Sequence, residues 1–339
     1  MKNWILIILL GVVFVSCETE TETERNKILM SSNVESQTKA LVLDNTALGS
    51  LGFGVFTYAK LGTFDSINDK PDYYYNIRVY KPASVWTSSV NMYWPENTNY
   101  KLSFIAYAPY STVDNGITLS PITQTGYPIL IYYSNNSDIT KQVDLCYSLP
   151  QLNKNQAQGT VAFDFKHSLS KISFSAKNYY AYDTISGCKI KSIRLTNIIN
   201  KGSIRLSSDP SWTPSALISD TGSYNLSISN SMLNDLKLNL DYQLINQNNA
   251  CLMLIPQNID LAKTKLEVVI SDLAGVDIKT TYITLNAMSI TQLTKGQNLN
   301  IRLSVISGNV YADFVIIPWD TFTFTESQIG KKMLTNKIF

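Results

Sequence analysis

The sequence predicts an all-β protein of two tandem β-sandwich domains that follow a lipoprotein signal peptide. Short runs of alternating apolar and polar residues recur along nearly the whole chain, separated by Asn, Gly, Pro and Ser, a pattern typical of half-buried strands joined by turns. Only 16% of the residues are charged and tyrosine occurs 20 times, which favours extracellular β structure. After the signal about 320 residues remain, more than one domain usually contains.

The first 16 residues form the predicted signal peptide. Lys2 precedes an apolar run from Trp4 to Val15, which is too short to span a bilayer and matches the apolar region of an export signal. A small residue directly before Cys17 is what a lipoprotein signal peptidase requires, although Phe14 stands where such signals usually have Leu. We predict that Cys17 is acylated, with palmitate among its chains, and anchors the mature protein to a membrane. An ordinary cleaved signal is the alternative.

Residues 17–27 form a predicted acidic tether. Thr and Glu alternate up to Glu24 with nothing apolar to bury, as expected for a solvated spacer. An acidic tract directly after a lipidated cysteine also resembles the surface-export signal of lipoproteins in Bacteroidetes-type bacteria, which implies the outer membrane or cell surface as the location. Basic residues do not cluster before the last dozen positions, so the charge pattern excludes a nucleic-acid partner.

Residues 28–180 form the predicted N-terminal sandwich, which opens with the apolar segment Ile28-Leu29-Met30. In the run Tyr73–Tyr80 we expect the odd-numbered side chains on one face and the even-numbered ones on the other. Turn-forming clusters such as Asp114-Asn115-Gly116 end the runs. The other clear runs of this half are Phe53–Thr57, Leu102–Ala106, Val161–Phe165 and Ile172–Ala176.

Residues 181–339 form the predicted C-terminal sandwich, since the alternation lapses between Asn178 and Gly187 and then resumes. The segment Ser231–Ile245 fits a helix and a strand equally well. Beyond Trp319, alternation returns in Phe322-Thr323-Phe324-Thr325, and a strand beyond a finished sheet needs a partner. We therefore predict a donor strand within residues 320–339, with Phe322 and Phe324 as its apolar side chains.

The chain lacks the residue patterns of the common enzymes, so we predict no catalytic residue, cofactor or metal. His167 is the one histidine, no GxSxG turn is present, and neither a dinucleotide nor a phosphate-binding glycine loop occurs. We interpret His167 as a structural residue. A calcium site among Asp65, Asp69 and Asp72 lacks the EF-hand spacing.

The cysteines and tryptophans permit two interpretations each. Once Cys17 is lipidated, three cysteines remain, and we interpret them as packed thiols, with one disulfide as the alternative. Trp86 and Trp94 are candidate contacts for a host glycan, because aromatic rings in β loops stack on sugars, but aromatic residues in sandwiches more often belong to the core. The three remaining cysteines are Cys146, Cys188 and Cys251.

Several motifs, in their order along the chain, resemble the fimbrillin family of Bacteroidales. The ordered combination spans nearly the whole chain from Ile28. The sequence departs from the family's pattern at Lys39, where Arg is usual, and at Cys146, where Leu or Met is usual. The motifs are Met92–Pro95, Leu102–Pro109, Asp144–Tyr147, Phe163–Lys171, Leu254–Gln257, Leu293–Gln297 and Ile317–Trp319.

The resemblance implies transthyretin-like sandwiches that are exported as surface lipoproteins and assembled into a pilus. A trypsin-like protease then removes the lipidated arm with the first strand, and a neighbouring subunit supplies a strand to the opened groove. The candidate cut lies between Lys39 and Ala40; Arg25 is the fallback, although a cut there leaves the first strand in place.

The predicted function is therefore a structural pilus subunit, and not an enzyme. Its predicted partners are other pilin subunits and, through Cys17, a membrane. A subunit that is never cut would remain anchored at the pilus base. The alternative from another class is a surface-anchored glycan-binding or adhesin lipoprotein that does not polymerise, with a host glycan or protein as its partner.

Overall fold

The structure is a computed structural model that describes residues 26–34, 44–178, 189–227, 242–245, 251–272, 274–306, 308–317 and 319. The predicted signal peptide, Cys17, nearly all of the tether, Lys39, Ala40, Cys188 and the predicted donor strand with Phe322 and Phe324 lie outside these residues. Only the end of Ser231–Ile245 is described, and it contains the short strand β16 (Gln243–Leu244). No described helix is long and apolar enough to cross a membrane.

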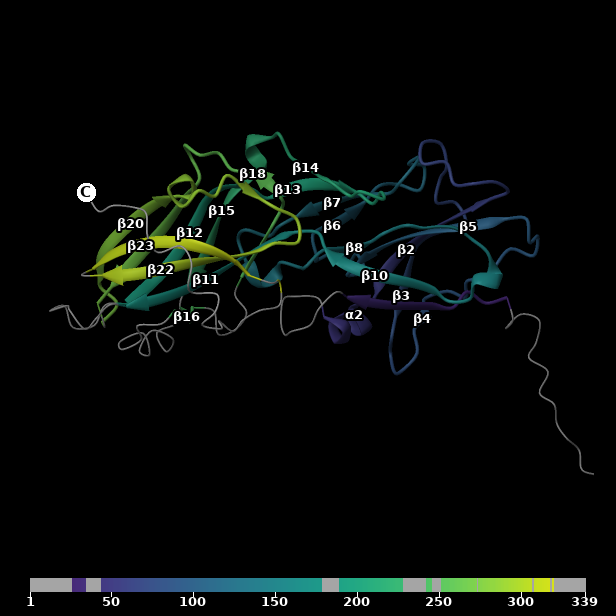
Figure 1. Cartoon of the computed structure of the whole chain (residues 1–339), viewed down its shortest axis with the longest axis horizontal. Coiled ribbons are helices and arrows are strands. Elements are labelled where there is room, and N and C mark those ends of the chain that lie inside the picture. The colour runs from purple at the N-terminus through teal and green to yellow at the C-terminus, as the bar shows by residue number, and fades with distance from the viewer. Residues whose placement is uncertain are drawn as a thin grey trace, which may run out of the picture.

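The all-β prediction is confirmed: the described residues form strands in five sheets and one α-helix, α2 (Asn45–Leu51). Figure 1 shows these sheets as two layered units placed side by side along the long axis of the molecule. We number the four larger sheets 1 to 4, and their strands are given in the next two paragraphs. Sheets 1 and 2 form the first sandwich, and sheets 3 and 4 form the second. A two-stranded ribbon of β18 (Gln257–Asn258) and β21 (Gln292–Leu293) completes the set.

The strands of the first sandwich come mostly from the first half of the chain. Sheet 1 runs in the order β1 (Met30–Val34), β10 (Val161–His167), β8 (Cys146–Ser148), β5 (Lys101–Ala108), β2 (Phe53–Lys60), β3 (Tyr74–Tyr80) and β4 (Thr87–Ser88), and β9 (Gln151–Lys154) pairs with β5. Sheet 2 runs in the order β14 (Trp212–Pro214), β13 (Lys201–Arg205), β7 (Ile129–Tyr133) and β6 (Ile117–Leu119).

The second sandwich is built from later strands. Sheet 3 runs in the order β16, β11 (Ser170–Asn178), β22 (Asn298–Ile306) and β23 (Asn309–Ile317), and β17 (Leu252–Leu254) also pairs with β11. Sheet 4 runs in the order β15 (Thr221–Ser227), β12 (Lys189–Ile199), β19 (Lys265–Ser271) and β20 (Asp277–Thr284). Short 3-10 turns in the connections include η1 (Ile139–Lys141), η2 (Gln156–Gln158), η4 (Ile218–Asp220) and η7 (Leu285–Met288).

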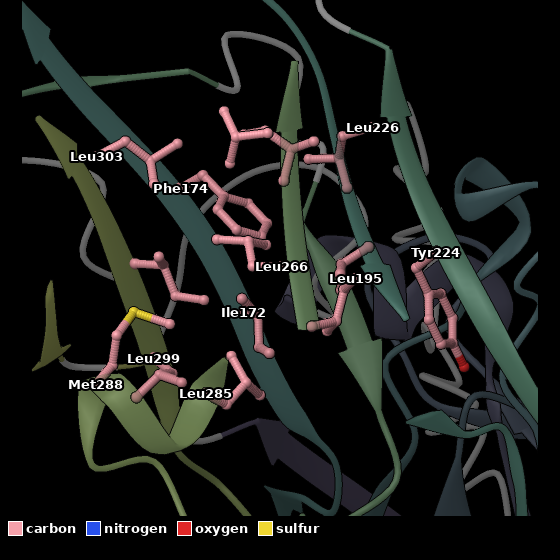
Figure 2. Packing of buried hydrophobic residues seen from close by; sticks show 14 of the residues in the cluster. Ile172, Phe174, Leu195, Tyr224, Leu226, Leu266, Leu285, Met288, Leu299 and Leu303 are labelled. Carbon is pink, nitrogen blue, oxygen red and sulfur yellow. The ribbon is translucent and has the colours of Figure 1, made fainter. Parts of the chain in front are cut away.

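Sheet 1 is buried on both faces because alternate residues of its strands are apolar in both positions. In β2, Phe56 and Tyr58 face sheet 2, whereas Phe53 and Val55 face the opposite way, toward α2 and the segment around Trp94. The second sandwich has a single core between its two sheets, where Ile172 and Phe174 of β11 meet Leu195 and Leu266 of sheet 4, as Figure 2 shows. The first sandwich thus contains two cores and the second contains one.

Strand β3 departs from the expected alternation. Tyr75 packs in the core that faces sheet 2, whereas Ile77 and Val79 pack in the core on the opposite face. The cause is Asn76, whose φ of 50° is left-handed and accompanies a shift in register against β2. A bulge of this kind adds one residue to a strand and reverses the faces of the side chains beyond it, so the expected common face of Tyr73–Val79 is wrong at Tyr75.

Strand pairing also differs from the predicted division of the chain at residues 180 and 181. The strand β11 precedes that division, yet it pairs with β16, β17 and β22 of the second half. Conversely, β13 follows the division and pairs with β7 over five residues. The lapse of alternation marks where strands end, but it carries no information on which strand each neighbour pairs with.

Candidate functional site

The strand β1 lies at the edge of sheet 1 and is paired along one side with β10. The two strands run parallel, in register from Met30 opposite Val161 to Val34 opposite Phe165. Just before the strand, the chain turns its other side to residues 92–94: the Ile28 N–H donates to the Met92 carbonyl at 2.8 Å, and the Trp94 N–H donates to the Asn26 carbonyl at 2.8 Å. The segment 26–34 therefore joins two parts of the sheet.

The apolar side chains of this segment complete the core on that face of sheet 1. Ile28, Met30 and Val34 are buried beside Phe163 and Phe165 of β10. Burying such a side chain contributes about 2 kcal/mol, so the three together stabilise the first sandwich by roughly 6 kcal/mol. Removing the segment would expose the aromatic rings beneath it to water.

The end of β1 is fixed by the residues that begin α2. The Val34 N–H donates to Asn45 Oδ1 at 2.9 Å, while Asp44 Oδ1 caps the helix by accepting from the Ala47 N–H at 2.7 Å. The predicted cleavage position, Lys39 and Ala40, lies in the connection between β1 and α2, outside the described residues. A cut there would separate β1 covalently from everything that follows it.

A cavity of about 710 Å³ lies beside the start of β1. It is lined by Ile28 and Met30 of this segment and by Val79, Pro82, Val85 and Trp86 of the opposite wall. Leu29 and Val85 are exposed there. The chain is therefore incompletely covered where it enters β1.

The two tryptophans that were candidate glycan contacts both contribute to the core of sheet 1. Trp94 is buried and packs edge-on against Phe104 at a centroid distance of 5.9 Å. Trp86 is half-buried and packs against Phe53 at 5.3 Å, with the Lys81 ammonium 5.9 Å from its ring. Trp94 is thus enclosed in the core, whereas Trp86 also lines the cavity beside β1.

A buried polar cluster lies where the two sandwiches meet. Asp144 precedes β8 by two residues, and Cys146 and His167 are direct partners between β8 and β10, so all three side chains share one face. His167 Nδ1 is 2.8 Å from Asp144 Oδ2 and 3.5 Å from Cys146 Sγ. Burial, and then the charge of Asp144, raises the pKa of the Cys146 thiol well above its usual range, which keeps the thiol protonated.

This cluster does not have the geometry of a catalytic triad. The acid and the thiol both contact Nδ1 of His167, whereas a triad needs them on opposite ring nitrogens. The three groups lie within 4.8 Å of one another and are all buried, so in chemical type they resemble a metal site. The fully buried Lys171 and Asp144 both lie near the Cys251 thiol, on whose pKa their charges act in opposite directions.

Trp319 connects this cluster to the end of the described chain. Its indole stacks on the His167 ring with centroids 4.4 Å apart and planes 14° apart. Its carbonyl oxygen accepts from Lys171 Nζ at 2.9 Å and from Asn298 Nδ2 at 3.4 Å. Sequence reasoning placed Trp319 in the motif Ile317–Trp319 and missed these contacts.

The acidic loop considered for calcium binds its own backbone and a lysine. Asp65 Oδ1 accepts from the Ile67 and Asn68 N–H groups at 2.8 and 3.2 Å. Asp69 pairs with Lys60 Nζ at 2.6 Å and accepts from the Asp65 N–H at 2.8 Å. The carboxylates of Asp65 and Asp69 are thus held by contacts within the protein.

Comparison with known proteins identifies relatives of this architecture. The model of a family described as fimbrillin-like matches residues 38–319. A fimbrial protein from Bacteroides vulgatus has a similar structure, with a TM-score of 0.64 at 19% identity over 87% of this chain and 99% of that one. A candidate cell adhesion protein from Bacteroides uniformis gives a TM-score of 0.57 at 13% identity over 86% and 99% of the two chains. No curated protein matches the sequence.

Proposed function

The chain belongs to the fimbrillin-like family, and from this membership we propose that it is a structural subunit of a surface fimbria. The observation that carries the proposal is the position of β1. It is the first described strand, it lies at the edge of its sheet, and it pairs with β10 over only five residues. One backbone cut after such a strand removes its only covalent link to the rest of the described fold.

Assembly proceeds by strand exchange. Export as a lipoprotein through Cys17 brings the subunit to the outer surface, and a protease cuts after Lys39. The released segment leaves an edge of unpaired N–H and C=O groups on β10 and empty positions where Ile28, Met30 and Val34 were packed. A strand from residues 320–339 of a neighbouring subunit fills them, with Phe322 and Phe324 taking apolar positions. Because donor and acceptor differ, the contact is head to tail and gives open filaments.

Cleavage and assembly are tested together on the intact chain. Treatment with a Lys-specific protease should give Ala40 as the new N-terminus by sequencing, followed by ladders on native gels and filaments by electron microscopy. Lys39→Gln should abolish both, while the matched control Arg25→Gln should leave both unchanged. A protein that is cut at Lys39 and stays monomeric at high concentration contradicts the proposal.

The donor and the lipid are tested separately. A chain that ends at Trp319 should be cut normally but fail to extend ladders, because it keeps an acceptor edge and lacks a donor. Cells expressing Cys17→Ala should not incorporate labelled palmitate into the protein, whereas wild type should. Ladders formed by the truncated chain would refute residues 320–339 as donor without affecting the cleavage result.

A further inference from the structure

The buried cluster of Asp144, Cys146 and His167 directs three different ligand atoms at one point. We call these three side chains the junction cluster. The carboxylate and the thiol both face the same ring nitrogen, Nδ1 of His167, which excludes a catalytic triad but is the arrangement that coordination to one centre needs. Among the residues that the structure describes, it is the one group of three such side chains gathered closely enough to hold a metal ion.

The separations between the ligand atoms are close to those of a tetrahedral zinc site. Zinc bonds of about 2.0 Å to nitrogen or oxygen and about 2.3 Å to sulfur place neighbouring ligand atoms about 3.3 to 3.6 Å apart. Cys146 Sγ is 3.5 Å from His167 Nδ1 and 3.8 Å from Asp144 Oδ1. Only the 2.8 Å contact between His167 Nδ1 and Asp144 Oδ2 has to open, by about half an ångström.

Paired strands hold the junction cluster in position. Cys146 and His167 are direct partners across β8 and β10, which are joined by three residue pairs. The backbone beside them is fixed as well, because the Ser168 N–H donates to the Leu145 carbonyl at 2.9 Å. Ligands carried by strands in this way are arranged before a metal ion arrives.

Trp319 orients one of the ligands without blocking it. Its indole lies flat on the His167 ring, with planes 14° apart and centroids 4.4 Å apart. The lone pairs of an imidazole lie in the plane of its ring, at the edge, so a ring stacked on the face leaves coordination through Nδ1 possible. Groups that fix the orientation of a ligand in this way are a regular part of metal sites.

The charges of the junction cluster suit a buried dication. A carboxylate, a thiolate and a neutral imidazole carry two negative charges, so the complex with Zn²⁺ has no net charge, as burial requires. On binding, Cys146 gives up its thiol proton to solvent, and His167 coordinates through Nδ1 with its proton on Nε2. Burial raises the pKa of the Cys146 thiol, but a coordinating metal ion deprotonates a thiol outright.

The donor atoms favour zinc over the cations that prefer oxygen. Calcium and magnesium take oxygen ligands, whereas thiolate and imidazole are typical zinc ligands. A site with three protein side chains has one further tetrahedral position. The Asp144 backbone carbonyl oxygen, 3.7 Å from Cys146 Sγ, is placed to take it.

We propose that the junction cluster binds one Zn²⁺ ion through Asp144, Cys146 and His167. The ion ties β8 to the end of β10, just before the chain enters β11 of the second sandwich. The site is independent of the proposed strand exchange, because it uses neither β1 nor a donor strand. It departs from the expectation of no metal drawn from the sequence, since the ligands become neighbours only through strand pairing.

Burial determines how the ion enters. His167 is 8% exposed, and Asp144 and Cys146 are exposed still less. Zinc therefore reaches its ligands while the chain folds, or later through local opening of the structure. Once bound, it should leave slowly, whereas an ion held by surface carboxylates would exchange with a chelator as fast as the solutions mix.

Refolding in the presence of zinc tests the site. The full-length chain carrying Cys17→Ser and Cys188→Ser, so that neither thiol contributes, is reduced, stripped of metal in guanidinium, refolded with zinc and desalted. Plasma mass spectrometry should find about one zinc per chain, released slowly to a chelator. Cys146→Ser should retain at least about tenfold less, the loss that follows even removal of a group that only orients a ligand. Cys251→Ser removes a buried thiol outside the junction cluster and should retain zinc.

Three results of the refolding experiment overturn the proposal. They are a parent chain that holds no zinc, a folded Cys146→Ser chain that keeps it, and zinc that exchanges on mixing. Folding of each variant is checked by circular dichroism. If Cys146→Ser does not fold, His167→Gln replaces it, with the same expected loss and the same consequence if zinc is retained.

Cobalt identifies the ligands without changing any residue of the junction cluster. Co²⁺ occupies zinc sites, and a thiolate bound to it gives a charge-transfer band in the near ultraviolet. The same parent chain refolded with Co²⁺ should show this band, with the strong visible bands of tetrahedral cobalt, and zinc should abolish both when it replaces cobalt during refolding. Bound cobalt without the thiolate band overturns the proposal, whether or not any variant folds.

Discussion

The molecule contains two parallel strand pairs among its described strands, and they differ in almost every other respect. In the first sandwich β1 lies beside β10 at the edge of the sheet, with five residue pairs. In the second, β11 lies beside β22 in the interior of the sheet, with eight pairs and with β16 and β17 on its other side. In the proposed assembly the first pair is separated and the second is kept.

The difference follows from the order of the strands in the chain. Parallel neighbours require a long crossover between them, so each member is joined to its partner only through much of the fold. Because β1 is the first described strand, its loss breaks only the connection that leads from it to α2. The strand β11 stands between the two halves of the chain, and its loss would divide the molecule.

The largest expected effect is in the β11–β22 pair. Phe174→Ala should lower the free energy of unfolding by about 4 kcal/mol, because the ring is fully buried between sheets 3 and 4 and leaves a cavity. Guanidinium denaturation followed by circular dichroism measures it, with Phe174→Leu as the smaller-volume control. A loss below that of Met30→Ala would reverse the contrast drawn between the two pairs.

A matching large-to-small substitution in the β1–β10 pair should lower the free energy of unfolding by less than Phe174→Ala does. Met30→Ala should cost about 2 kcal/mol in the uncut chain, because Met30 packs at the edge of its core. The same guanidinium denaturation measures this loss, and a loss as large as that of Phe174→Ala would contradict the ranking of the two pairs.

A smaller effect is expected at the bond that fixes the end of β1. Asn45→Ala removes the acceptor for the Val34 N–H and should cost about 1 kcal/mol. Hydrogen exchange should show faster exchange at residues 30–34, while β11 is unchanged. Ser50→Ala, which removes an exposed bond on the same helix, is the control, and equal acceleration in both variants would show a general loosening of α2.

The smallest effect is a difference between the sandwiches at alkaline pH. Burial raises the pKa of Cys251 from 9.0 to about 11, and burial raises the pKa of Cys146 as well. Both thiols belong to cores of the first sandwich. Because the thiols of the unfolded chain lose their protons at lower pH than the buried thiols, the free energy of unfolding of the metal-free protein falls as the pH rises from about 9 toward 11. At pH 9 the loss relative to neutral pH is roughly half a kcal/mol per thiol.

Tryptophan fluorescence can separate the two sandwiches in that measurement. The described tryptophans, Trp86, Trp94, Trp212 and Trp319, all pack in cores of the first sandwich, whereas circular dichroism reports both sandwiches. At pH 9 the fluorescence midpoint should shift to lower denaturant more than the dichroism midpoint. Equal shifts would mean that the sandwiches unfold as one unit.

Local sequence patterns predicted the longer strands of the first half of the chain. Apolar alternation placed β2, β5, β10 and β11 because a half-buried strand repeats every two residues regardless of its partner. The same patterns predicted β structure on both sides of residue 180. They could not assign β11 to the later sheets, since pairing depends on residues more than one hundred positions away.

The candidate site was only partly accessible to such reasoning. The apolar segment Ile28-Leu29-Met30 was expected to begin a first strand, and β1 begins at its last residue, Met30. Its bond to Asn45 and its contact with residues 92–94 depend on tertiary placement. The same holds for Trp319, whose stacking partner His167 lies far earlier in the chain, at the end of β10.

The pairing of β7 with β13 has a mechanical consequence. Five residue pairs join a strand of the first half of the chain to one of the second, in addition to the covalent link at β11. A pull applied to opposite ends of the molecule would have to break these bonds before the halves could separate. Under flow at a cell surface, the two sandwiches of such a subunit would therefore bear tension together as one stiff unit, and would not move apart on a flexible linker.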